Sequence, residues 1–151
     1  MLESFTHVGI VVEDIEKSIR FYQEVIGLEL RGTSDNEGLE KHRKLLGFPE
    51  VHLKTAGLAL SDGFILELLQ YVEPKGKDAR FDRNDVGSVH MAFHVRDIDE
   101  LYRLTSSKGL TYINPPTPTY EDGRIVRRSS YAQDPDGNWL EFIEVIPQTN
   151  D

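Results

Sequence analysis

The feature that most constrains the fold of this chain is that its sequence repeats. Residues 5–16 align with residues 88–99, so that His7 falls opposite His90 and Asp14 opposite Asp97. A second match joins residues 62–67 to 136–141, and Glu67 then falls opposite Glu141. Such repetition indicates two copies of one supersecondary unit. Each copy carries one His near its start and one Glu near its end, which is typical of a four-ligand metal site between two half-domains.

Alternation predicts a strand at the start of each copy, because residues two apart in a strand share a face. One face is apolar and should pack beneath a helix, whereas the His face also carries small residues and resembles a cavity wall. The apolar positions are Val8, Ile10, Met91 and Phe93. By the same alternation we expect four residues of the later strands to line that cavity: Trp139, Ile65, Leu69 and Tyr71.

A helix should follow each strand. Asp14 and Asp97 are suitable N-caps, Glu100 completes a capping box with Asp97, and Gly27 and Gly109 are placed to end the helices. Three further strands are predicted in each copy, at 28–32, 51–60 and 64–71, and at 110–113, 124–133 and 138–145. Residues 35–48 are extra in the first copy and weakly helical, consistent with a short helix or lid, and prolines 115, 116 and 118 mark a loop.

The predicted fold class is α+β, with tandem βαβββ modules forming a curved mixed sheet around a metal-binding cleft. We expect one domain over residues 1–151, made of module one (4–72), a polar linker (73–86) and module two (87–147). The sequence leaves open whether the modules pair within one chain or across a homodimer.

The composition limits the classes of molecule that this chain is expected to bind. The net charge of −9 argues against binding to nucleic acid or to an anionic membrane, so a small-molecule substrate is expected. The absence of cysteine excludes disulfides, thiolate zinc sites and a cysteine nucleophile. No signal peptide or membrane-spanning apolar stretch is visible, and a cytoplasmic location is therefore predicted.

Several residues suggest chemistry in their own right. Glu67 interrupts the apolar run of residues 64–69, and a buried carboxylate must be paired, neutralised or bound to metal. His94 falls on the cleft face and would be a substrate contact, or else structural. Arg124, Arg127 and Arg128 either bind an anionic substrate group or form a solvated basic edge. Tyr131 shares a nominal face with Arg127 and would line the cleft.

The chain resembles the vicinal-oxygen-chelate superfamily, also called the glyoxalase/bleomycin-resistance/extradiol-dioxygenase superfamily. The resemblance rests on His7, on the helix pattern of residues 14–28, and on residues 134–141, which read Asp-Pro-Asp-Gly-Asn-Trp-Leu-Glu. The pattern is most similar to glyoxalase I and methylmalonyl-CoA epimerase-like members. Carried over position by position, the resemblance implies that four residues bind the metal: His7, Glu67, His90 and Glu141.

Two imidazoles and two carboxylates suit a divalent Zn, Ni, Co, Mn or Fe ion and leave positions for substrate oxygens. Such a metal polarises a carbonyl, and Glu67 or Glu141 would then act as the catalytic residue that moves a proton. No residues are assigned to an organic cofactor. The predicted function is a metal-dependent lyase or isomerase, of glyoxalase-I-like or epimerase-like type. The alternatives are an extradiol-type dioxygenase and a non-enzymatic small-molecule binding or resistance protein.

Overall fold

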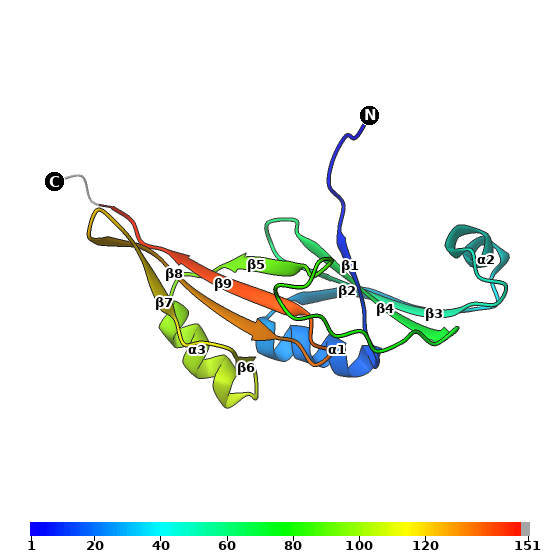
Figure 1. Cartoon of the computed structure of the whole chain (residues 1–151). Coiled ribbons are helices and arrows are strands. Elements are labelled where there is room, and N and C mark those ends of the chain that lie inside the picture. Colours follow the sequence, from blue (N-terminus) through cyan, green and yellow to red (C-terminus); the bar gives the residue numbers. More distant parts are fainter. Residues whose placement is uncertain (149–151) are drawn as a thin grey trace. The chain divides into compact units, whose positions relative to one another are not determined.

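The computed structural model describes residues 1–148, which form two compact units divided between Ala79 and Arg80. Each unit is described by itself. The first contains β1 (Val8–Val11), α1 (Ile15–Phe21), the π-helical turn η1 (Tyr22–Ile26), β2 (Glu29–Glu37), α2 (Glu40–Leu46), β3 (His52–Ala59) and β4 (Ile65–Glu73). Its four strands make one mixed sheet in the order β1-β4-β3-β2, with β1 parallel to β4 and the other pairs antiparallel (Figure 1).

The second unit repeats this arrangement. It contains β5 (His90–His94), α3 (Ile98–Ser107), β6 (Thr111–Tyr112), β7 (Thr117–Glu121), β8 (Arg124–Gln133) and β9 (Trp139–Val145). The strand order is β5-β9-β8-β6, β5 runs parallel to β9, and β7 pairs with β8. The predicted α+β fold with two βαβββ-type modules and mixed sheets is confirmed. In each unit the first strand lies parallel beside the last, so the His-bearing and Glu-bearing segments become neighbours.

Local signals in the sequence set the helix ends. The Asp14 carboxylate accepts a hydrogen bond from the Lys17 N–H at 3.0 Å, and the Asp97 carboxylate accepts one from the Glu100 N–H at 2.9 Å. These bonds satisfy backbone donors that a helix leaves unpaired in its first turn. Gly27 ends η1 with a φ of 90°, a left-handed conformation that favours glycine.

Each unit has its own core between helix and sheet. In the first unit the buried side chains include Val12, Ile15, Ile19, Tyr22, Leu58, Leu66 and Leu68. In the second unit Phe93 is 8% exposed and its ring stacks on Phe142 at 6.0 Å. Val8, Ile10 and Met91 are half-buried, whereas Gly9, Ala92 and His94 on the alternate positions are exposed. The predicted alternation along β1 and β5 is thus confirmed.

Three predicted boundaries were wrong. Strand β2 continues to Glu37 because it pairs along the whole of β3, and α2 is correspondingly shorter than the predicted 35–48 segment. The proline-rich loop after β6 contains the additional strand β7, in which Pro118 lies opposite Arg128. Proline is tolerated there because β7 pairs with β8 on one side only, so the missing N–H breaks no ladder.

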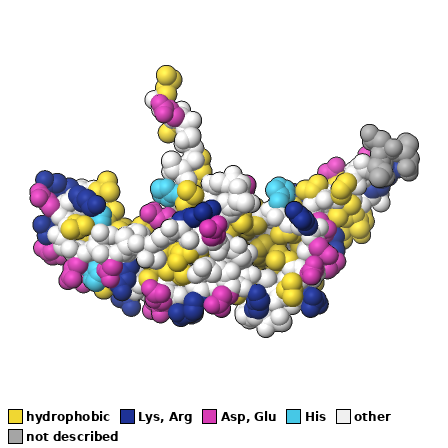
Figure 2. All heavy atoms as spheres, turned by 180° about the vertical axis from the view of Figure 1, so that it is seen from behind, with side chains coloured by type: hydrophobic (Ala, Val, Ile, Leu, Met, Phe, Trp, Pro, Cys, Tyr) yellow, Lys and Arg dark blue, Asp and Glu magenta, His cyan; other side chains and the backbone are white. Residues whose placement is uncertain are grey.

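The surface carries charged side chains of both signs (Figure 2). Figure 2 shows acidic and basic side chains intermixed, most densely where α2 contributes Glu40, Lys41, Arg43 and Lys44. None of the helices within residues 1–148 is both long and apolar enough to traverse a lipid bilayer.

Candidate functional site: two histidine–glutamate pairs

The first pair lies in the first unit. Glu67 sits on β4, whose parallel neighbour β1 begins directly after His7, and His7 Nε2 lies 3.4 Å from Glu67 Oε2. The Thr6 hydroxyl is 3.0 Å from His7 Nδ1 and holds the other edge of the ring. The side chains of His7 and Glu67 are 46% and 35% exposed. Glu67 is therefore neither the buried carboxylate that its apolar neighbours suggested nor an edge-strand residue, because β4 is central in its sheet.

Glycines surround Glu67 in the sheet. Gly9 on β1 and Gly57 on β3 are its cross-strand partners, and Gly32 on β2 lies opposite Gly57. A Cβ added at Gly32 or Gly57 would meet no atom within 4 Å. Glycine inside a strand often marks a place where another group approaches closely. The side of Glu67 that faces Gly57 is therefore open, whereas a Cβ added at Gly9 would lie 3.2 Å from Leu69 Cδ1 and 3.8 Å from Glu67 Oε2.

The second pair has the same construction with denser surroundings. His90 Nε2 lies 3.3 Å from Glu141 Oε2, and the Glu141 side chain is only 13% exposed. The cross-strand partners of Glu141 are Ala92 and Tyr131 rather than two glycines. The Tyr131 ring also packs edge-on against the His90 imidazole, with ring centroids 5.6 Å apart.

Tyr131 is linked electrostatically to Glu141. The Tyr131 pKa is raised above its ordinary value, chiefly because burial disfavours the phenolate. The hydrogen bond with the Glu141 carboxylate and the charge of that carboxylate raise the pKa further, against the opposing charges of Arg83 and Arg127. Tyr131 thus remains a hydroxyl donor, and Glu141 is held from two sides, by His90 and by Tyr131.

The donor atoms of each pair suit a divalent metal. Their separations of 3.4 and 3.3 Å exceed a well-formed N–H···O bond. They match the roughly 3.0–3.4 Å expected between neighbouring ligands that each lie about 2.1 Å from a metal. Within residues 1–148 there is no group of three or more His, Asp or Glu side chains that could hold a metal ion. The structure thus brings the predicted ligands together as two pairs, and their union in one four-ligand site stays a prediction.

The other predicted cleft residues are distributed between the units. In the first unit Leu69 and Tyr71 follow Glu67 along β4, and the Tyr71 ring meets Phe48, just beyond α2, at 6.0 Å. In the second unit His94 is exposed on the His90 side of β5 and Trp139 is buried. The three arginines do not form one cluster. Arg127 is exposed and lies on the same face of β8 as Tyr131, whereas Arg128 turns to α3 and forms a two-pronged ion pair with Asp99.

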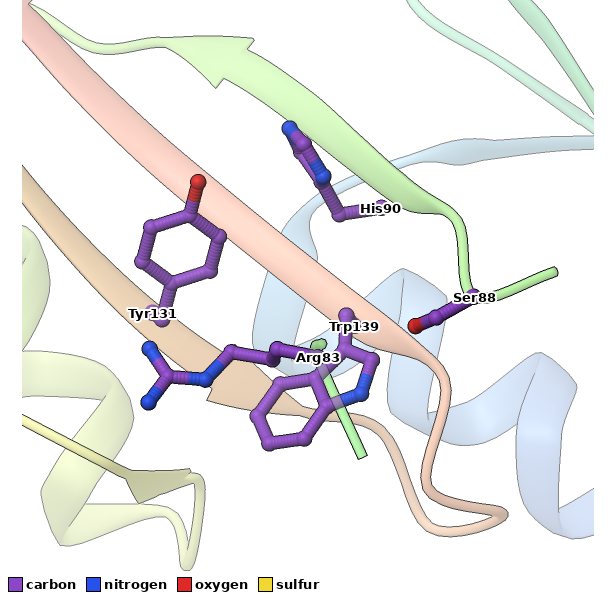
Figure 3. A pocket seen from close by; sticks show the side chains of 5 residues that line it. All are labelled: Arg83, Ser88, His90, Tyr131 and Trp139. Carbon is purple, nitrogen blue, oxygen red and sulfur yellow. The ribbon is translucent and has the colours of Figure 1, made fainter. Parts of the chain in front are cut away.

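A pocket of about 240 Å³ next to the second pair includes two residues that sequence reasoning missed. Its lining consists of Arg83, Ser88, His90, Tyr131 and Trp139 (Figure 3). Arg83 comes from the polar stretch predicted as the linker between the modules, and Ser88 is the first residue of the repeated segment in the second copy. The stretch carries two arginines, Arg80 and Arg83, and the sequence does not specify which strand either side chain would reach.

Comparisons with known proteins identify the family. Residues 4–142 match the model of the Glyoxalase/Bleomycin resistance protein/Dioxygenase superfamily. A 2-epi-5-epi-valiolone epimerase from Actinomyces sp is 33% identical over 92% of this chain and 78% of its own length. A lactoylglutathione lyase from Haemophilus influenzae is 28% identical over 91% of this chain and 90% of its own.

A solved structure agrees with this relationship. The crystal structure of a glyoxalase family protein from Bacillus cereus superposes with a TM-score of 0.85 at 26% identity, and 97% of each chain is covered. The two histidine–glutamate pairs lie within a fold that these proteins share. The chain therefore belongs to the Glyoxalase/Bleomycin resistance protein/Dioxygenase superfamily.

Proposed function

We propose that the protein is a divalent-metal-dependent isomerase or lyase that moves a proton at the carbon next to a substrate carbonyl. The observation that carries the proposal is the duplicated pair: one imidazole and one carboxylate at 3.4 Å in the first unit and at 3.3 Å in the second. Two imidazoles and two carboxylates are a ligand set for a divalent transition metal rather than for a hard cation alone.

The four side chains that would hold the metal are His7, Glu67, His90 and Glu141. When bound, the metal would act as a Lewis acid that polarises the substrate carbonyl and makes the adjacent C–H more acidic. The Thr6 hydroxyl beside His7 Nδ1 favours this arrangement, because it orients the ring with Nε2 directed to Glu67.

The carboxylates differ in how freely they could move a proton. Glu67 is more exposed than Glu141, and a Cβ added at its cross-strand neighbour Gly57 would meet no atom within 4 Å, so a substrate carbon could approach its carboxylate from the Gly57 side. Glu141 is held by Tyr131 and His90. We assign proton removal to a Glu67 carboxylate oxygen, and to Glu141 a holding role with return of the proton as a secondary one.

Among the two proton-transfer reactions, the epimerase is the leading assignment. The Actinomyces relative, at 33% identity, carries that name, and the lyase from Haemophilus influenzae at 28% identity supports the same kind of chemistry. Epimerisation needs only removal and return of a proton at one carbon. Two carboxylates, one from each unit, supply an acid and a base for that exchange.

The test is solvent-deuterium exchange under anaerobic conditions. Protein reconstituted with each candidate metal would be incubated in D₂O with 2-epi-5-epi-valiolone, acyl-CoAs and hemithioacetals, and deuterium would be located by NMR. We expect metal-dependent deuterium at the carbon next to the carbonyl. Elemental analysis should show that His7→Ala and His90→Ala each lose the metal. Undiminished metal in both variants would overturn the ligand assignment.

The same preparation tests the dioxygenase alternative. A catechol panel under air, with ferrous iron and an oxygen electrode, would reveal ring cleavage. Oxygen uptake stoichiometric with cleavage, and unaffected by Glu67→Gln, would overturn the proton-transfer proposal. A metal-dependent activity limited to anaerobic exchange would support it.

A further inference from the structure

We propose that Arg83 binds a carboxylate group of the substrate in the pocket beside His90 and so determines substrate specificity. The proposal rests on the proposed function and assigns the substrate to carbonyl compounds that also carry a carboxylate. The neutral 2-epi-5-epi-valiolone does not belong to that class and serves in the exchange test only as a probe of the reaction. The five lining residues of the pocket include one permanent cation, one hydroxyl from Ser88 and two aromatic rings.

The segment that carries Arg83 is fixed to the second unit. The Trp139 indole N–H donates a hydrogen bond of 2.9 Å to the Phe81 carbonyl, which ties the chain to β9 two residues before Arg83. A turn follows, in which the Asp82 N–H donates to the Asp85 carboxylate and the Ser88 N–H to the Asp85 carbonyl, at 2.9 and 3.0 Å. Arg83 and Ser88 therefore flank one hydrogen-bonded turn and face the same pocket.

The guanidinium of Arg83 is held by aromatic rings. Its Cζ lies 5.4 Å from the centroid of Tyr131 and 5.3 Å from that of Trp139, within the range of cation–π contact. In Figure 3 the guanidinium lies beside these two rings, and the Tyr131 hydroxyl and the His90 imidazole point to the same side of the pocket. Aromatic contacts orient a guanidinium while leaving its N–H donors available.

Those donors have no acidic partner in the part of the chain that the structure describes. Among the described residues, no carboxylate lies within ion-pair distance of Arg83, although the chain carries 26 Asp and Glu against 17 Lys and Arg. The Glu141 carboxylate is engaged by His90 and Tyr131. An oriented guanidinium without a carboxylate partner, in a pocket that also holds a hydroxyl, is a binding site for an oxyanion.

The charge and size of the pocket favour a carboxylate over a phosphate. Arg83 is the single permanent cation in the lining, and the volume is about 240 Å³, which is smaller than most drug-sized pockets. One guanidinium matches the single charge and planar oxygens of a carboxylate. A phosphate group at neutral pH carries more charge than this lining would neutralise.

The test uses isobutyrate and isobutyramide, which have the same shape and differ in charge. The chain has one tryptophan, so the spectrum of ¹⁵N-labelled protein contains one indole N–H resonance, and that group lies beside Arg83. We expect isobutyrate to shift this resonance saturably and isobutyramide to bind at least about 10-fold more weakly. Binding without added metal separates this result from the outcome of the activity experiments.

Three variants test whether Arg83 supplies the positive charge that binds isobutyrate. Arg83→Gln should weaken isobutyrate binding about 10-fold or more, Arg83→Lys should weaken it less, and Arg103→Gln on the exposed side of α3 should leave it unchanged. The indole resonance also checks folding, because it depends on the bond to Phe81. Equal binding of the two probes, or unchanged binding in Arg83→Gln, would overturn the proposal. So would tighter binding of inorganic phosphate than of isobutyrate.

The result separates cleanly from the proposed function. If isobutyrate binding depends on Arg83 but the protein has no proton-exchange activity, the proposed proton-transfer function is wrong and the carboxylate site at Arg83 stands. If the protein exchanges protons but isobutyrate binding does not depend on Arg83, the carboxylate site is wrong and the proton-transfer function stands. If both hold, Arg83→Gln should raise KM for a carboxylate substrate with little change in kcat.

Discussion

The first and second units place the same two side chains on equivalent strands and surround them differently. In the first unit Glu67 lies in a row across the sheet whose other members are Gly9, Gly57 and Gly32. In the second unit Glu141 lies between Ala92 and Tyr131. The repeat thus preserves the frame that brings His and Glu together, while the cross-strand neighbours set how exposed and how constrained each carboxylate is.

The histidines differ in the same way. His7 is oriented through Nδ1 by the adjacent Thr6 hydroxyl, a contact between sequence neighbours. His90 is packed against the Tyr131 ring, a contact between distant parts of the second unit. Local support in one unit and tertiary support in the other imply that substitutions will affect the two pairs unequally.

The largest expected difference is between Glu67→Gln and Glu141→Gln. An amide oxygen still ligates a metal but is a poor base, so Glu67→Gln should retain metal and lose about 10²–10⁴-fold in proton exchange. Glu141→Gln should instead lower the metal content, because the charge of the most buried ligand is removed. Elemental analysis and deuterium exchange on both variants make the comparison. Equal behaviour of the two variants would contradict the division of roles.

A second difference concerns the cores beneath the first strands. Phe93 is buried on β5 and stacks on Phe142, and its counterpart in the repeat is the half-buried Ile10 on β1. Phe93→Ala should lower the free energy of unfolding by about 3–5 kcal/mol, and Ile10→Ala by about 2 kcal/mol or less. Chemical denaturation measures both. A larger loss for Ile10→Ala would show that the first unit depends more on this position.

These cores are also where the sequence was most informative. Strand alternation identified Phe93 as buried, and the two Asp N-caps identified the helix starts, because both patterns depend only on local backbone geometry. The pairs His7–Glu67 and His90–Glu141 were predictable as well, since the repeat constrains strand and residue type together.

Features that depend on strand register were not predictable. The glycine row requires knowing that Gly57 lies opposite Glu67 and Gly32 opposite Gly57, although isolated glycines in strands hinted at a close approach. Tyr131 was predicted on the cleft side, but its bond to Glu141 follows from pairing of β8 with β9. Arg83 is positioned in the pocket by a turn and by the hydrogen bond from the Trp139 indole to the Phe81 carbonyl. Neither feature produces a periodic pattern in the sequence.

A third prediction tests the local support of His7. Thr6→Val keeps the shape of the side chain and removes the hydroxyl beside Nδ1. Loss of an outer hydrogen bond to a metal-binding His costs about 10–100-fold in metal affinity. Competition with a chromophoric chelator measures that change. Thr111→Val, at an exposed position on β6, is the matched control and should leave the affinity unchanged. An unchanged affinity in Thr6→Val would mean that Glu67 alone orients the ring.

The smallest expected effect concerns an ion pair that is present on the outer face of α3 and has no equivalent on α1 among the described residues. Asp99 on α3 pairs with Arg128, and the hydrogen bond from this arginine holds the Asp99 pKa below its ordinary value. The counterpart of Asp99 in the repeat is Glu16 on α1. The counterpart of Arg128 is Lys54, which lies near Asp35 instead. A lowered folded-state pKa contributes stability above the unfolded pKa of about 3.9, and that stability is lost as the pH falls through the folded value.

Arg128→Gln should therefore lower Tm by about 1–2 °C at pH 7, because the pair is exposed and screened by solvent. The difference from the wild type should shrink as the pH falls below about 4. Thermal unfolding from pH 7 to pH 2.5 measures both, with Lys54→Gln as the counterpart in the first unit. A Tm difference that persists at pH 2.5 would mean that Arg128 stabilises α3 by packing rather than by charge, and the contrast between the two helices would then rest on side-chain shape.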